Sequence, residues 1–122
     1  MTGMRRLGLV RDCVDPERLG EFWAAALGYK LVGAAGQYVV LYPSQPGEPK
    51  LLLQGVPEAK AVKNRMHLDI ETPDIEAEAT RLQALGATRV SAATQCEHGN
   101  TWILMADPEG NEFCVCDGGA GS

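Results

Sequence analysis

The sequence lacks any apolar run near the roughly 20 residues that a membrane-spanning helix needs. The apolar stretch after the first arginines is short and broken by charge, unlike a secretory signal peptide. Basic residues are also in the minority, since 11 Lys and Arg oppose 16 Asp and Glu and leave a net charge of −5. Nucleic acids and anionic membrane surfaces require a basic face, so neither is expected as a partner. Together these absences predict a cytoplasmic protein.

The chain has four cysteines among its 122 residues. In a cytoplasmic protein we expect them to be reduced. Cys114 and Cys116 lie two apart on an expected strand, where a bond between such near neighbours would be strained. The sequence also has no nucleophile elbow, no phosphate-cradling loop and no paired carboxylates in a catalytic pattern. Catalytic residues therefore stay unassigned.

An internal repeat is the main feature that the chain does have. Asp15 opens a helical segment that closes at Gly28, and Asp74 opens a similar segment that closes at Gly86, about half a chain length later. A repeat of this size is one supersecondary unit that cannot bury its own apolar face. Two copies must therefore pack together, and a seam between similar halves is a natural place for a pocket.

Each half is expected to run strand, helix, strand, strand, strand. The expected strands cover residues 7–13, 29–32, 38–42 and 50–54, and then 66–71, 88–92, 101–106 and 112–116. The predicted fold is α+β, with two repeated βαβββ modules that form curved mixed sheets around a shared cavity. The whole chain, 1–122, is expected to be one domain, with module one at about 5–56, a linker at about 57–63 and module two at about 64–117.

Three sequence segments point to a known family. They are residues 12–18 with the following Phe22-Trp23 and Leu27-Gly28, residues 63–69, and residues 102–116 with their Asp-Pro-Glu-Gly-Asn turn. Jointly they resemble the vicinal-oxygen-chelate superfamily, in particular its glyoxalase-like domain branch, whose relatives include glyoxalase I, bleomycin-resistance proteins and extradiol dioxygenases. The resemblance spans nearly the whole chain apart from the termini. It implies a cavity that binds a small-molecule ligand, in a homodimer.

In metal-dependent members, the resemblance places ligands on the first and last strands of each half. His67 stands at one such position, but Gly8 at the equivalent position of the first half has no side chain. Cys114 replaces the usual Glu, and the remaining position falls on Gln54 or Leu52. Catalytic sites for zinc, nickel or iron use about three protein ligands and an open position. We therefore expect no tightly bound metal and no cofactor.

Four side chains are the predicted ligand contacts, namely His67, Trp102, Gln54 and Cys114. His67 could be a metal ligand, a general base, or a structural residue that organises Asp69. Trp102 could stack on a planar ligand or lie in the core or a dimer interface. Cys114 could join His67 at a metal, or could be a small apolar wall residue, as buried cysteine often is.

The function that these features favour is small-molecule binding in a cavity of glyoxalase/bleomycin-resistance type, without a tightly bound metal. The alternative is a lyase, an isomerase or a dioxygenase-type enzyme that uses His67 with a metal. Small-molecule binding without a metal requires only a pocket that is mostly apolar with a few polar groups. Fold analogy alone does not separate the two, because one fold hosts many chemistries.

Overall fold

The computed structural model describes residues 6–91, 94–97 and 100–117. The chain divides into two compact units, Met1–Ala59 and Lys60–Ser122. The boundary between them falls within the linker that the sequence predicts.

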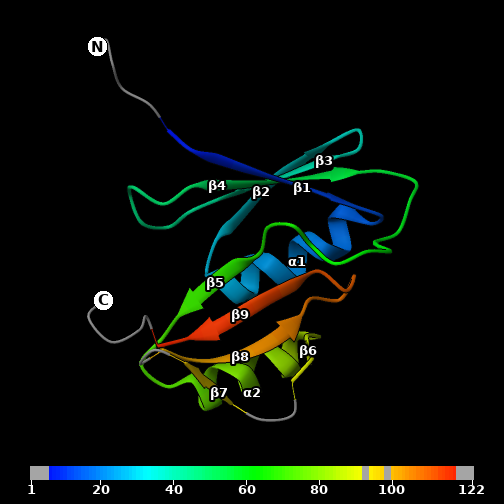
Figure 1. The fold of residues 1–122 in the computed structure, drawn as a ribbon. Coiled ribbons are helices and arrows are strands. Elements are labelled where there is room, and N and C mark those ends of the chain that lie inside the picture. The colour runs from blue at the N-terminus through cyan, green and yellow to red at the C-terminus, as the bar shows by residue number, and fades with distance from the viewer. Residues whose placement is uncertain (1–5, 92–93, 98–99, 118–122) are drawn as a thin grey trace. The chain divides into compact units, whose positions relative to one another are not determined.

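The first unit is a four-stranded mixed sheet with one helix. Its elements are β1 (Gly8–Cys13), α1 (Pro16–Leu27), β2 (Lys30–Ala35), β3 (Tyr38–Tyr42) and β4 (Lys50–Gly55). The strand order is β1-β4-β3-β2, with β1 parallel to β4 and the other pairs antiparallel. Helix α1 packs on one face of this sheet (Figure 1).

Local signals set both ends of α1. The Asp15 side chain accepts a hydrogen bond from the backbone N–H of Arg18 at 3.2 Å, and Pro16 occupies the first helical position. Gly28 ends the helix in the left-handed region, with φ of 69°. Beneath the helix, a Cβ on Gly20 would lie 3.0 Å from the Val39 side chain, so this glycine lets α1 approach the sheet closely.

Among the described residues of the first unit, no helix covers the other face of this sheet. Leu51 and Leu53 are buried on the α1 side of β4, so the alternate residues Leu52 and Gln54 project from the helix-free face. Val10 is the direct partner of Leu52 across the β1–β4 ladder and shares that face, with 57% of its surface exposed. Val10, Leu52 and Gln54 therefore lie on one surface of the first unit.

The second unit repeats this design. Its elements are β5 (Leu68–Glu71), α2 (Ile75–Leu85), β6 (Thr88–Arg89), β7 (Gln95–Glu97), β8 (Asn100–Ala106) and β9 (Glu112–Cys116). The order is β5-β9-β8-β6, with β7 also paired to β8, and β5 runs parallel to β9 as β1 does to β4. The two matching topologies confirm the α+β fold of repeated βαβββ modules.

One expected strand of the second unit differs from the prediction. Residues 88–92 were expected to form a single strand, but β6 ends at Arg89 and the separate strand β7 pairs with the other end of β8. The N–H groups of Val90 and Ser91 both donate to the carbonyl of Leu104, at 2.8 and 3.3 Å. Two successive residues opposite one partner interrupt the ladder in the manner of a bulge. Residue 92 of this expected strand lies outside the described residues.

Helix α2 and the last turn follow the sequence signals closely. Asp74 caps α2 by accepting the N–H of Ala77 at 3.1 Å, and Gly86 closes it with φ of 123°. The buried carboxylate of Asp107 accepts the N–H groups of Glu109 and Asn111, each at 2.9 Å, and so holds the β8–β9 turn. Neither helix of the described chain has the length and apolar character needed to cross a membrane.

Candidate functional site

In the second unit, helix α2 packs on one face of the sheet, and we call the opposite face its helix-free face. This face brings together a histidine, an aspartate and a cysteine. Asp69 on β5 is the direct partner of Cys114 on β9, so both side chains leave the sheet on the same side. His67 precedes Asp69 by two residues, and its Nε2 lies 3.5 Å from Asp69 Oδ1. The ligand atoms of all three residues lie within 4.8 Å of one another. We call this group the donor cluster.

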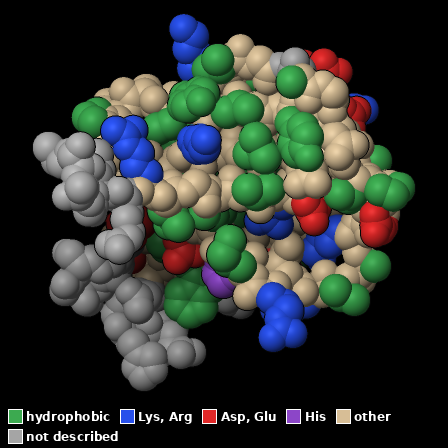
Figure 2. Space-filling view, turned by 90° about the horizontal axis from the view of Figure 1, so that it is seen from above, with side chains coloured by type: hydrophobic (Ala, Val, Ile, Leu, Met, Phe, Trp, Pro, Cys, Tyr) green, Lys and Arg blue, Asp and Glu red, His purple; other side chains and the backbone are tan. Residues whose placement is uncertain are grey.

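The donor cluster is accessible from solvent. The side chains of His67 and Asp69 are 51% and 55% exposed, while Cys114 is half-buried. A histidine side chain is visible at the surface in the space-filling view (Figure 2). An added ion or small molecule can therefore reach these atoms without opening the core.

The Cys114 thiol is a weak acid in this setting. Burial raises its pKa to about 11, and the negative charge of Asp69 adds to the effect. A thiol of this kind is protonated near neutral pH and is a poor nucleophile. Free thiolate chemistry at Cys114 is therefore disfavoured, whereas a coordinating metal ion would remove the proton outright.

The segment that leads into His67 is tied to the end of β9. Asn64 accepts a hydrogen bond from the backbone N–H of Glu112 at 2.8 Å, and Lys63 Nζ lies 2.6 Å from Glu112 Oε1. The bond from Lys63 holds the pKa of the Glu112 carboxyl below its usual value. These contacts continue the β5–β9 pairing beyond the first residue of β5 and so help to place His67.

Trp102 and Leu104 on β8 extend the same face. Leu104 is the direct partner of Cys114, and Trp102 is the direct partner of Cys116, one step further along. All four of these side chains are half-buried. The face therefore joins an apolar surface to the polar atoms of the donor cluster.

The structure thus places three of the four predicted contact residues on one face. His67, Cys114 and Trp102 share the helix-free face of the second unit, whereas Gln54 lies on the helix-free face of the first. Asp69 was expected only as a partner of its neighbours, and its place beside Cys114 was missed. The signal was present in the spacing, because His67 and Asp69 alternate with Leu68 and must point to one side.

The metal-ligand positions that the family resemblance implies do not all carry ligands here. Gly8 has no side chain, and its partner across the ladder is Lys50. Within the described residues, the donor cluster is the one group of three His, Cys, Asp or Glu side chains close enough to hold an ion. An imidazole, a carboxylate and a thiolate suit zinc and similar ions. The donors of the second unit therefore fit a metal, although the family's full ligand set is not present.

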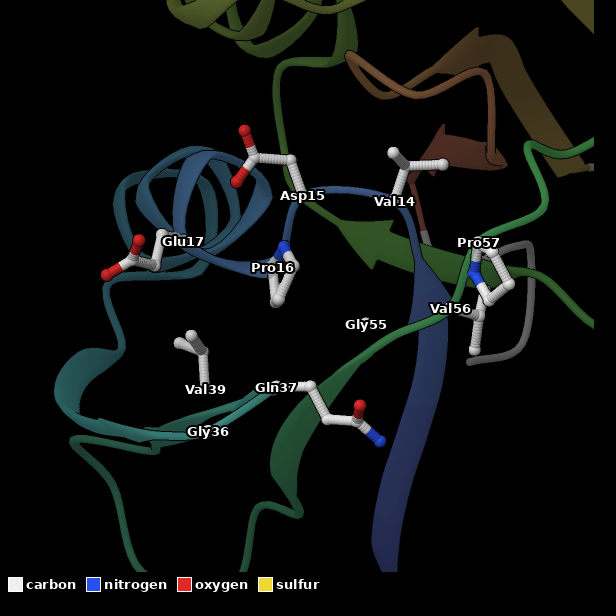
Figure 3. A pocket seen from close by; sticks show the side chains of 10 residues that line it. All are labelled: Val14, Asp15, Pro16, Glu17, Gly36, Gln37, Val39, Gly55, Val56 and Pro57. Atoms are coloured by element: carbon white, nitrogen blue, oxygen red, sulfur yellow. The ribbon is translucent and has the colours of Figure 1, made fainter.

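A separate hollow lies in the first unit and was not expected from the sequence. It has a volume of about 430 Å³ and is lined by the start of α1, the β2–β3 turn and the residues that follow β4 (Figure 3). Backbone bonds from Gly55 to Gln37 and from Val56 to Cys13, both 2.7 Å, shape it. The carboxylates of Asp15 and Glu17 point away from its centre. It has no donor cluster and offers little specific chemistry.

Comparison with known proteins agrees with the fold. The family described as "Glyoxalase-like domain" matches residues 8–116. No curated protein matches the chain. One similar solved structure is a glyoxalase/bleomycin resistance protein/dioxygenase family enzyme from Burkholderia phytofirmans PsJN, with a TM-score of 0.71 and 16% identity, covering 88% of this chain and 94% of that chain.

Two further solved structures give the same result. A glyoxalase-related enzyme from Fulvimarina pelagi has a TM-score of 0.71 and 17% identity, covering 93% of this chain and 88% of its own. A glyoxalase/bleomycin resistance protein/dioxygenase from Nocardioides has a TM-score of 0.68 and 19% identity, covering 100% of this chain and 90% of its own. At these identities the likeness shows the fold alone.

Proposed function

The chain belongs to the glyoxalase-like domain family of the vicinal-oxygen-chelate superfamily, and we propose that it binds a small molecule on the helix-free face of its second unit. The fold is that of a small-molecule-binding or enzyme domain of glyoxalase, bleomycin-resistance or dioxygenase type. Binding through His67, Trp102 and Cys114, without a tightly bound metal, is the form that we propose. Gln54 is proposed as a further contact, and a homodimer as the assembly.

The proposal rests on the side chains that lie on the helix-free face of the second unit. Trp102, Leu104 and Cys114 supply half-buried apolar surface, and His67 and Asp69 supply polar atoms at its border. Small-molecule sites are mostly apolar with a few placed polar groups that fix orientation. The indole offers a flat surface for stacking. The ligand class that fits best is a planar, largely apolar compound with at least one hydrogen-bonding group.

A thermal-shift screen tests the proposal. Chelator-treated protein is screened against metabolites and drug-like compounds, since a ligand at 100 times its dissociation constant adds about 2.7 kcal/mol of stability. His67→Ala and Trp102→Ala should each reduce the shift that the best ligand causes. Glu21→Gln, on the exposed surface of α1, is the matched control and should leave the shift unchanged. Equal binding by wild type and both site variants would overturn the assignment.

A metal-dependent enzyme is the second candidate, because three ligand atoms lie within 4.8 Å of one another in the donor cluster. Two of the similar structures are also described as enzymes. A metal held by His67 would supply Lewis-acid polarisation of a substrate oxygen. Elemental analysis of the protein as purified separates the candidates. The binding proposal expects well under one metal per chain, whereas one tightly held metal that is lost in His67→Ala would favour the enzyme.

A further inference from the structure

The donor cluster brings three possible metal-ligand atoms close together, and small-molecule binding does not require this. We propose that His67, Asp69 and Cys114 form an exchangeable site for a zinc-like divalent cation that is complete within the second unit. In this site Asp69 supplies the third ligand, in place of the one that Gly8 cannot supply. The inference goes beyond the proposed function and does not depend on it.

The backbone already places two of the three ligands. Asp69 and Cys114 are direct partners on parallel strands, which fixes the origin of both side chains. Metal–ligand bonds of about 2.0–2.3 Å in a tetrahedral site put donor atoms roughly 3.3–3.8 Å apart. The donors here lie within 4.8 Å of one another, so closure needs movements of about an ångström. Rotation of exposed side chains between rotamers supplies movements of this size.

Asp69 is available to serve as a ligand. The distance of 3.5 Å between its Oδ1 and His67 Nε2 exceeds that of a good hydrogen bond, and both side chains are about half exposed. Even a fully charged pair that is this exposed would contribute little to stability. A cation between the two groups would replace a weak contact with two coordination bonds, at little structural cost.

The chemistry of the donors selects the class of ion. Magnesium and calcium prefer sites made wholly of oxygen atoms, and such sites do not include a thiol. An imidazole nitrogen, a carboxylate oxygen and a thiolate sulfur suit zinc, cobalt(II) and related ions. With three protein ligands and an exposed histidine, at least one coordination position stays open to solvent. An open site with three ligands is expected to release its ion more readily than a closed structural site.

The experiment is a titration of the chelator-treated full-length chain with Co²⁺, followed by displacement with Zn²⁺. Cobalt bound to a thiolate gives a ligand-to-metal charge-transfer band, which reports coordination without any assay of activity. We expect saturation at one ion per chain, with displacement by zinc. Asp69→Asn and His67→Ala should each weaken binding about tenfold or more, and Cys114→Ser should remove the band. Because Cys114 is half-buried, Cys114→Ala serves as a second variant if the serine disturbs folding.

Two neighbouring positions provide matched controls. Glu71 follows Asp69 by two residues on β5, and Cys116 follows Cys114 by two residues on β9, so both lie on the same face outside the cluster. Glu71→Gln and Cys116→Ser should bind cobalt within about twofold of wild type. The proposal is overturned if Asp69→Asn binds as wild type does, if the band survives loss of Cys114, if one ion binds per two chains, or if no cobalt binds.

Discussion

Asp69 and Cys114 face each other directly across the parallel β5–β9 ladder, and this pairing sets the chemistry of the second unit. Burial raises the pKa of the thiol and the carboxylate adds to the effect, while the shared face brings both groups within reach of His67. The same pair therefore suppresses free thiol reactivity and offers adjacent ligand atoms to an ion. A ligand on this face would meet polar atoms at one end and the side chains of β8 and β9 at the other.

The high pKa of Cys114 predicts slow alkylation. In metal-free protein near pH 8, a thiol whose pKa is about 11 is almost entirely protonated, whereas an ordinary cysteine is partly ionised. Iodoacetamide should therefore modify Cys114 much more slowly than a model cysteine peptide does. Tandem mass spectrometry of the modified peptide separates Cys114 from Cys116. Asp69→Asn should speed the reaction, and a rate equal to that of the free peptide would contradict the pKa.

Asp107 should be important for stability rather than for binding. Its buried carboxylate accepts backbone bonds from Glu109 and Asn111 and also bonds to the Asn111 side chain. Asp107→Ala leaves buried donors without their acceptor, so the free energy of unfolding should fall by about 2–3 kcal/mol. Urea unfolding measures this loss. Asp107→Asn, which keeps one acceptor oxygen, should lose less, and a change below about 0.5 kcal/mol in the alanine variant would contradict the role.

The Glu78–Arg81 pair on α2 predicts a dependence of stability on pH. Hydrogen bonds from Arg81, of 2.9 and 2.7 Å, hold the pKa of Glu78 below its usual value. The stabilisation is therefore present above the unfolded pKa and is lost as the pH falls through the lower folded value. Glu78→Gln should cost up to about 1 kcal/mol at pH 7 and nearly nothing at about pH 2–3. Unfolding of both proteins at the two pH values measures this, and a pH-independent difference would contradict it.

Much of the fold follows from local sequence signals. The caps Asp15 and Asp74 and the glycines Gly28 and Gly86 are read from the chain directly, and the structure confirms all four at the helix ends. Strand β9 also has the predicted bounds, because its alternating apolar residues are followed by the tail and preceded by the turn. These features depend on residues that are close in sequence.

The missed features depend on contacts between distant segments. The break between β6 and β7 follows from Val90 and Ser91 sharing the carbonyl of Leu104. Asp69 enters the donor cluster only because the parallel register places it opposite Cys114. Alternation along one strand gives the face of a residue but not its partner on another strand. The shared cavity expected from the sequence stays a prediction for the same reason.

A homodimer is the assembly that we expect in solution. Static light scattering at micromolar concentration should give about twice the chain mass of 13.1 kDa. Dilution over a hundredfold range should then show whether the pair separates. A mass equal to one chain across the whole range would contradict the expected dimer.

The most direct test of the proposed function maps the ligand onto the chain by NMR. Isotope-labelled, chelator-treated protein is titrated with the best compound from the thermal-shift screen, and shifts of backbone amides, the indole and the imidazole are followed. We expect the largest changes at His67, Trp102 and Cys114, and His67→Ala should reduce them throughout. The contradicting result is a set of largest changes around the hollow of the first unit, at Val14, Gln37 and Gly55, while His67 and Trp102 do not respond.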